Sequence, residues 1–167
     1  MDLTNFHHLD IVLICGIPGC GKSHFAKAFF QEEGRKRINR KEIRRHIYEM
    51  TSFGDKWKEE YFDEEGESLV KHVERKIYEQ FLQNMDRVLI DNPSVTKSSR
   101  KNYLSLAEQK FKTTGIIFLN TPLMKCMERN KKRDDAVPDK VISTLYSSIE
   151  LPGKDEGFDE ILVVSDY

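Results

Sequence analysis

An apolar run, Ile11–Cys15, leads directly into the glycine-rich segment Gly16–Ser23, whose sequence is GIPGCGKS. The run has the character of a buried parallel strand, and the residues after it, Ser23–Gln31, have the spacing of a helix that stops near Gly34. A segment of pattern G-x-x-x-x-G-K-[ST] between a strand and a helix is typical of phosphate-binding loops. This feature constrains the fold most, because it predicts an α/β domain built around that loop.

The residue types in this loop suit a nucleotide triphosphate. Glycines let the backbone approach closely enough for its N–H groups to face phosphate oxygens, and the following helix N-terminus adds positive potential. Lys22 would contact the β- and γ-phosphates, and the Ser23 hydroxyl would bind Mg²⁺. We therefore expect ATP and Mg²⁺ as cofactors, with Ser23 as the metal ligand. The expected nucleotide-binding residues of this segment are Gly16, Pro18, Gly19, Cys20, Gly21, Lys22, Ser23 and His24.

The remaining apolar patterns alternate between strand and helix. Predicted strands cover Arg87–Asp91, Gly115–Leu119 and Ile161–Val164. Predicted helices cover Lys41–Met50, Glu67–Asn84, Ser98–Lys110, Pro122–Asn130 and Pro138–Ser148. The pattern predicts a parallel sheet of four to five strands with helices on both faces. At this length we expect a single domain over residues 1–167.

Charge and cysteine usage narrow the possible partners and the compartment. The chain carries 27 basic and 28 acidic side chains, a balance that does not by itself indicate nucleic-acid binding. Seven Lys or Arg nevertheless fall in residues 35–45 and five in 125–133, whereas 55–67 is acidic. No apolar run approaches the roughly 20 residues that a membrane span needs. Cys15, Cys20 and Cys126 predict free thiols in a reducing compartment, and we expect a cytoplasmic protein.

Two segments resemble GTPase motifs without completing them. Asp63–Gly66 has the spacing D-x-x-G, but no apolar strand precedes it. Asn130–Arg133 begins like the guanine-binding N-K-x-D, but its fourth residue is arginine and it ends a predicted helix. A GTPase is therefore not expected.

Over residues 10 to about 150 the chain resembles the kinase domain of phage-type polynucleotide 5′-hydroxyl kinases. The resemblance rests on four segments in order, which are the phosphate loop, Ile38-Asn39-Arg40, Ile90-Asp91-Asn92, and Arg129-Asn130-x-Lys-Arg133 followed by Ala136-Val137-Pro138. It implies a P-loop kinase fold with a small lid at about 129–138. The implied activity is transfer of the γ-phosphate of ATP to a nucleic-acid hydroxyl.

The resemblance also assigns roles to individual residues. The lid arginine of the family falls on Arg133, where a planar cation would stabilise the transferring phosphoryl group, and Arg129 lies one turn earlier on the same face. The strand-end aspartate falls on Asp91, which should emerge at the carboxyl edge of the sheet beside the phosphates. The expected catalytic residues are Lys22, Asp91, Arg133 and Glu42, and Arg129 is expected to bind the nucleotide.

The acceptor segment departs from the family pattern. The family has an aspartate after Asn-Arg that accepts the hydroxyl proton and an arginine three residues later that holds the acceptor phosphate. Here the arginine is preserved as Arg44, but Lys41 occupies the aspartate position. Glu42 and Arg45 repeat the acid-x-x-Arg spacing one position later, so a shifted register and a lost or replaced base remain alternatives. We expect acceptor binding by Arg40, Lys41 and Arg44.

The proton-accepting role is expected to fall on Glu42 or Asp91, with Lys41 contacting a substrate phosphate. The leading hypothesis is a kinase acting on a nucleic-acid hydroxyl, either a 5′ end or a hydroxyl on a modified base. A small-molecule or nucleoside kinase of the same fold is a second hypothesis, and an ATP-dependent module that binds nucleic-acid ends without catalysis is a third. Trp57, Tyr61 and Phe62 either stack on an acceptor base or pack a lid.

Overall fold

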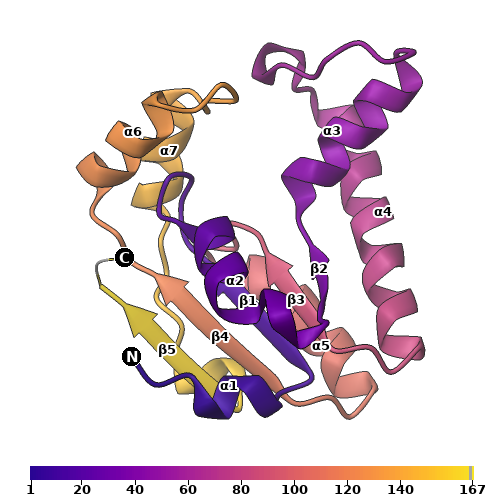
Figure 1. The fold of residues 1–167 in the computed structure, drawn as a ribbon, viewed down its shortest axis with the longest axis vertical. Helices are drawn as coiled ribbons and strands as arrows, with labels where there is room; N and C mark the ends of the chain where they lie inside the picture. Colours follow the sequence, from indigo (N-terminus) through magenta and orange to yellow (C-terminus); the bar gives the residue numbers. More distant parts are fainter. Residues whose placement is uncertain (166) are drawn as a thin grey trace.

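The computed structural model describes residues 1–165 and 167, and the described chain forms a parallel sheet with strand order β2-β3-β1-β4-β5 (Figure 1). The strands are β1 (Ile11–Cys15), β2 (Lys36–Ile38), β3 (Val88–Asp91), β4 (Thr114–Leu119) and β5 (Glu160–Val164). The helices are α1 (Thr4–His8), α2 (Lys22–Phe30), α3 (Arg40–Thr51), α4 (Glu64–Gln83), α5 (Lys97–Gln109), α6 (Leu123–Lys131) and α7 (Asp139–Ser147). Short 3₁₀ turns cover Gln31–Glu33, Glu59–Tyr61 and Lys154–Glu156.

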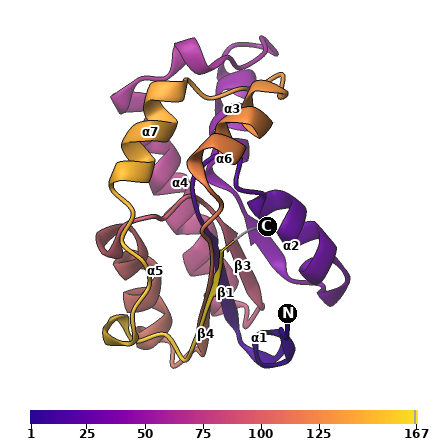
Figure 2. The same ribbon diagram turned by 90° about the vertical axis from the view of Figure 1, so that its left-hand side faces the viewer.

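The three central strands are apolar throughout because both faces of the sheet are covered. Every residue of β1, β3 and β4 is buried. Figure 2 shows α1 and α2 on one face of the sheet and α5 on the other. Strand β1 pairs in parallel with β3 and β4, so that Ile14 lies opposite Asp91 on one side and Ile117 on the other. The expected α/β fold is confirmed.

Two elements were not predicted from the sequence. Helix α1 has five residues, too few for a periodic pattern, and β2 lies inside the basic stretch 35–45. In β2 only Ile38 is buried, while Lys36 and Arg37 occupy the edge of the sheet. Charged side chains are common on edge strands, where they discourage pairing with other chains. Because of them, β2 contains no apolar run that would predict a strand.

Helix α4 begins three residues earlier than predicted. The Asp63 side chain caps it by accepting a 2.7 Å hydrogen bond from the Gly66 N–H. Glu64 and Glu65 then occupy the first turn, where acidic side chains interact favourably with the helix dipole. The expectation used apolar spacing alone and therefore missed this polar first turn.

Two helical arms rise beyond the carboxyl ends of the strands (Figure 1). One consists of α3 and α4, and the other of α6 and α7. The basic stretch 35–45 contributes β2 and the start of α3, whereas 125–133 contributes α6, so the two basic segments lie on different arms. Within residues 1–165 and 167, no helix is long and apolar enough to cross a bilayer.

The three cysteines are free, as predicted, and the structure shows that all three are buried. Burial raises the pKa of the Cys15 thiol to about 12 and that of the Cys126 thiol to about 11. Both thiols therefore stay protonated and unreactive near neutral pH.

Candidate active site

The phosphate loop is held in a conformation that only glycine adopts easily. Gly19 has φ +83°, and a Cβ atom there would lie 2.2 Å from the Cys126 carbonyl oxygen. The Gly16 N–H donates a 2.9 Å hydrogen bond to the Pro93 carbonyl, which ties the loop to the end of β3. The loop is thus fixed between the sheet and α6.

The Lys22 ammonium lies over this loop. Its Nζ donates to the carbonyl oxygens of Gly16, at 2.8 Å, and Ile17, at 3.0 Å. These are weak partners for a cation compared with a phosphate oxygen. Lys22 is therefore placed to exchange the carbonyl contacts for a triphosphate.

Ser23 and Asp91 form the oxygen pair that a magnesium site requires. The Ser23 Oγ donates a 2.9 Å hydrogen bond to Asp91 Oδ2, while the buried Asp91 Oδ1 has no hydrogen-bond partner among the described residues. Mg²⁺ prefers oxygen ligands and usually takes only one or two from the protein, with substrate phosphates and water completing the shell. The described residues contain no cluster of three His, Cys, Asp or Glu side chains that could hold a metal ion. The Ser23 and Asp91 oxygens fit Mg²⁺ held jointly with a triphosphate.

The Arg37 side chain connects Asp91 to Glu42 of α3. Its Nε and Nη2 donate to Asp91 Oδ2 at 3.0 and 2.6 Å, and its Nη1 donates to Glu42 Oε1 at 2.8 Å. Although partial burial opposes the charged form, these two carboxylates outweigh it and raise the pKa of Arg37. Both carboxylates are consequently fixed on one side of the cleft.

A polar network connects the end of β3 to the start of α3. The Asn39 side chain donates to the Asp91 carbonyl at 2.9 Å and accepts from the Glu42 N–H at 3.0 Å, which caps α3. The Asn92 side chain accepts from the Arg40 N–H at 2.8 Å. Buried Glu74 on α4 receives hydrogen bonds from the side chains of Arg40, Asn92 and Tyr103. The network anchors Arg40 in the fold.

The basic side chains of α3 divide between two faces of the helix. Arg44 donates twice to Glu67 of α4, at 2.9 and 2.7 Å, and its guanidinium lies 5.3 Å from the centre of the Phe62 ring. Lys41 and Arg45 lie one turn apart and line the cleft instead. The cleft-facing acid-x-x-Arg pair is therefore Glu42 and Arg45, the shifted register of the acceptor segment.

The segment expected to form the lid contacts α3 through a cluster of charges. Arg133 donates to Asp135 through Nε at 2.8 Å and Nη2 at 3.1 Å. Lys41 Nζ donates to the Asp135 carbonyl at 2.7 Å and lies 3.0 Å from both Asp135 Oδ2 and Glu59 Oε1. Partial burial alone would raise the pKa of Asp135, but the bonds from Arg133 and Lys41 outweigh it and lower that pKa to about 2.

At the opposite end of the phosphate loop, His24 and Arg129 contact Tyr167. The His24 Nδ1 and the Tyr167 hydroxyl lie 2.7 Å apart, and Arg129 Nη1 donates to the Tyr167 carbonyl at 2.6 Å. The Tyr167 ring meets Phe25 edge-on at 5.0 Å. The tyrosine thus covers the side of the loop next to Gly21.

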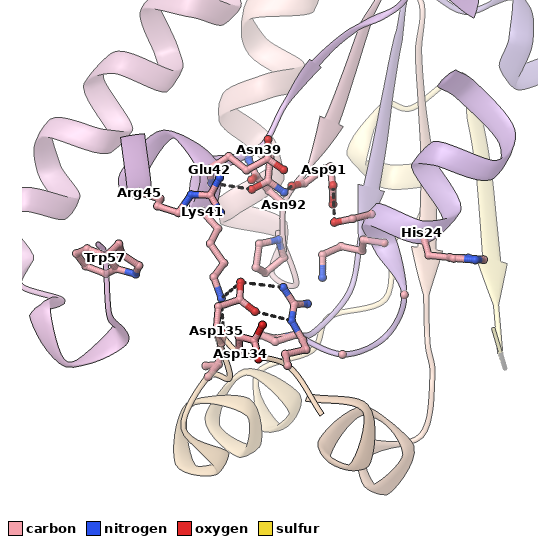
Figure 3. A pocket seen from close by; sticks show the side chains of 18 of the residues that line it. His24, Asn39, Lys41, Glu42, Arg45, Trp57, Asp91, Asn92, Asp134 and Asp135 are labelled. Atoms are coloured by element: carbon pink, nitrogen blue, oxygen red, sulfur yellow. Dashed lines mark hydrogen bonds and ion pairs between the residues drawn. The ribbon is translucent and has the colours of Figure 1, made fainter. Parts of the chain in front are cut away.

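These parts enclose one cleft of about 850 Å³, at the upper end of the range for ligand sites. Figure 3 shows Asp91 and Asn92 at its floor, Lys41, Glu42 and Arg45 along α3, Trp57 at one end and His24 at the other. Cations and carboxylates alternate around it, which suits a polyanionic ligand bound with a metal ion.

The structure brings the expected site residues together in the cleft, except for Gly16, Cys20, Arg40 and Arg44. The residues lining the cleft include Pro18, Gly19, Gly21, Lys22, Ser23, His24, Lys41, Glu42, Asp91, Arg129 and Arg133. The Cys20 side chain is buried instead. Arg40 and Arg44, expected at the acceptor, face α4 and its acidic residues. The unshifted register of the resemblance therefore places these two arginines on the face of α3 that packs against α4.

Three residues of the site were not expected from the sequence. Asp135 and Lys56 line the cleft, and Arg37 holds Asp91. Arg37 lies two residues before the segment Asn39-Arg40 and could have been suspected only if β2 had been recognised. Asp135 lies between the matched lid segments and carries no motif. No pattern in the sequence distinguishes Lys56 from other exposed lysines.

Comparison with known proteins places this geometry among P-loop kinases. A family model described as an AAA domain matches residues 11–152. The L-seryl-tRNA(Sec) kinase of Methanococcus maripaludis is 26% identical over 153 residues, covering 89% of this chain and 56% of the relative. The chain therefore spans little more than half the length of this curated relative.

Solved structures show the same fold at low sequence identity. A protein of Chloroflexus aurantiacus provisionally described as a kinase has a TM-score of 0.71 and 13% identity, with 92% of this chain and 83% of that chain covered. A chain of the Pnkp1/Rnl/Hen1 RNA repair complex has a TM-score of 0.61 and 22% identity, with 89% and 46% covered. These likenesses confirm the P-loop kinase fold and do not single out the phage-type polynucleotide kinases within it.

Proposed function

The chain belongs to the AAA domain family whose model matches residues 11–152, and from this premise we propose that it is an ATP-dependent kinase acting on a hydroxyl carried by a nucleic acid. One observation carries the proposal. The phosphate loop and the α3 face that bears Glu42 and Arg45 line the same cleft. A phosphoryl donor and an acceptor can therefore meet there without rearrangement of the sheet.

In this proposal the loop and the lid hold the triphosphate. The backbone N–H groups of the loop and Lys22 bind the β- and γ-phosphates, and Arg133 leaves Asp135 to contact the transferring group. Ser23 and Asp91 hold the metal ion. When bound, Mg²⁺ neutralises charge on the β- and γ-phosphate oxygens.

Glu42 is the proposed proton acceptor. Its carboxylate lines the cleft, and Arg37 links it to Asp91, whose Oδ2 accepts from Ser23 and Arg37 and which is the proposed metal ligand. The acceptor oxygen forms a bond to the γ-phosphorus while the bond from that phosphorus to the β–γ bridging oxygen breaks. The hydroxyl proton passes to Glu42, and ADP leaves.

Arg45 is the proposed ligand of the acceptor phosphate, with Lys41 one turn away. Arg45 is 3.9 Å from Glu49 and its side chain is 52% exposed, so it is available to a ligand. A cation that lines the same cleft as the proposed base suits an acceptor whose hydroxyl is followed by a phosphodiester. The name of the curated relative, an L-seryl-tRNA(Sec) kinase, supports a nucleic-acid acceptor, whereas the solved structures, which include a sugar kinase, show the fold alone.

Transfer of label from γ-labelled ATP to a panel of acceptors tests the proposal. The panel contains RNA and DNA oligonucleotides with 5′-hydroxyl ends, serylated tRNA and free nucleosides. We expect labelling of at least one nucleic acid, with affinity that falls steeply as salt rises. Equal labelling of a free nucleoside, without a salt effect, would favour a metabolite kinase, and ATP-dependent binding without labelling would favour a module that only binds ends.

A further inference from the structure

Three aromatic residues near the acceptor end of the cleft differ in what they contact. Tyr61 stacks on Tyr48, with ring centres 5.2 Å apart and an interplanar angle of 15°. Phe62 lies beneath Arg44 in a separate groove between α3 and α4. Trp57 meets Tyr48 edge-on at 5.3 Å and Tyr61 at 6.3 Å, and of Trp57, Tyr61 and Phe62 it alone lines the cleft.

The Trp57 ring lies at the far end of the cleft from the nucleotide loop. Figure 3 shows it beyond Arg45, across the cleft from His24. Its neighbours along the cleft wall are Arg45, Glu49 and Lys56. An acceptor whose hydroxyl faces Glu42 and whose phosphate contacts Arg45 would extend in this direction.

The indole N–H of Trp57 has no role in the fold. The nitrogen is buried and has no hydrogen-bond partner among the described residues. The fold therefore uses this side chain only for ring packing, which another apolar side chain can partly replace. Trp57 is half-buried and lines both the cleft and the groove between α3 and α4, and in the cleft its flanking cations Arg45 and Lys56 favour a polyanion.

We propose that Trp57 is the acceptor-recognition residue and stacks on the nucleobase next to the hydroxyl that is phosphorylated. The inference rests on the proposed function and narrows its substrate to an acceptor that carries a base. Aromatic stacking tolerates any base and strengthens binding, whereas Arg45 and Lys56 contact the backbone. Trp57 thus sets affinity for the acceptor and takes no part in the transfer step.

Intrinsic fluorescence tests this directly, because the chain contains one tryptophan. The full chain, saturated with ADP and Mg²⁺, is titrated with a short RNA bearing a 5′-hydroxyl and with the same RNA made abasic at its first nucleotide. We expect saturable quenching by the first RNA and little by the second. Equal quenching by both would overturn the proposal.

Kinetics of two matched variants supply the second readout. Trp57→Leu should raise KM for the RNA at least about tenfold, with kcat and the KM for ATP unchanged. Trp57→Phe should restore most of the affinity, which a loss of folding would not allow. Phe53→Leu is the control, since Phe53 is fully exposed outside the cleft and should change nothing. A Trp57→Leu enzyme with unaltered KM for RNA would refute the role.

The two proposals fail in different ways. If no nucleic acid is labelled by the wild type, the proposed function is wrong, whatever the quenching shows. If an RNA is labelled but the abasic RNA binds equally well, the kinase assignment stands and the role of Trp57 is wrong.

Discussion

On helix α3, neighbouring basic residues have opposite roles because an α-helix has 3.6 residues per turn. Arg40 and Arg44 share the face that packs on α4, where they meet Glu74 and Glu67. Lys41 and Arg45 share the face that lines the cleft. A shift of one residue in the helix register thus exchanges structural arginines for ligand-binding ones.

Arg45→Ala and Arg44→Ala form a matched pair that tests this division. Arg45→Ala should raise KM for an oligonucleotide roughly tenfold or more, because it removes a charge-assisted contact, and should leave stability nearly unchanged. Arg44→Ala should mainly lower stability, since Glu67 loses its partner. Steady-state kinetics and urea denaturation of both variants decide the matter, and the reverse pattern would restore the unshifted register.

Glu42→Gln and Asp91→Asn separate the two carboxylates. If Glu42 accepts the proton, Glu42→Gln should lower kcat by about 10²-fold or more and leave KM for ATP unchanged. Asp91→Asn should instead raise the Mg²⁺ concentration needed for half-maximal rate. A Glu42→Gln enzyme with normal kcat would show that positioning and charge neutralisation are sufficient. Lys41→Asp provides the comparison, because a faster enzyme would mean that the native chain works without a base.

At the scale of elements, the lid and α3 are joined through Asp135. This single carboxylate holds Arg133 from its own segment and Lys41 from the opposite arm. Arg133 and Lys41 are both expected to contact phosphates. Asp135 therefore occupies the position in the cleft that an anionic ligand would take. Binding of a triphosphate must exchange these contacts.

The depressed pKa of Asp135 predicts how the lid contacts depend on pH. A carboxylate whose pKa is lowered from 3.8 to about 2 stabilises the folded state above pH 4, and this contribution is lost as pH falls toward 2. Because the side chain is 47% exposed, we expect Asp135→Asn to lower stability by less than about 1 kcal/mol. Urea denaturation should show a constant difference from wild type between pH 5 and pH 8 that shrinks below about pH 4. A difference that widens on acidification would contradict the assignment.

The spacing of apolar residues predicted most helices and strands, but it did not predict the edge strand β2. The runs in β1, β3 and β4 predict strands because they are buried on both faces. The edge strand β2 escaped detection because two of its three residues, Lys36 and Arg37, are charged. It also carries Arg37, so the residue that joins Asp91 to Glu42 could not be found without the sheet order.

At the scale of the whole molecule, the site depends on strands that end at the same sheet edge. The sequence predicted the loop and the place of Asp91 at the carboxyl edge of the sheet. It could not predict that Asp135 contacts Lys41 across the cleft, because these residues are 94 positions apart in the chain. The sequence also could not show which side chains of α3 face the cleft, since this depends on how that helix packs against α4.

A buried ion pair ties α5 to the segment before β5. Arg100 is fully buried and donates to both carboxylate oxygens of Glu156 at 2.7 Å, while Glu156 is 5% exposed. Glu156→Gln should lower the free energy of unfolding by about 3–5 kcal/mol, because it leaves a buried cation without its counter-charge. The double replacement Arg100→Met with Glu156→Met should be less destabilising than Glu156→Gln alone. Strictly additive effects in urea denaturation would contradict the coupling.

The central claim is that this cleft transfers the γ-phosphate of ATP through the phosphate loop. Label transfer by Lys22→Ala, compared with wild type at equal helix content by circular dichroism, tests it most directly. We expect the wild type to transfer label to a nucleic-acid hydroxyl. Lys22→Ala should lose more than about 90% of this turnover, which corresponds to a barrier change above about 1.4 kcal/mol. Equal turnover by the two proteins would contradict phosphoryl transfer through the phosphate loop.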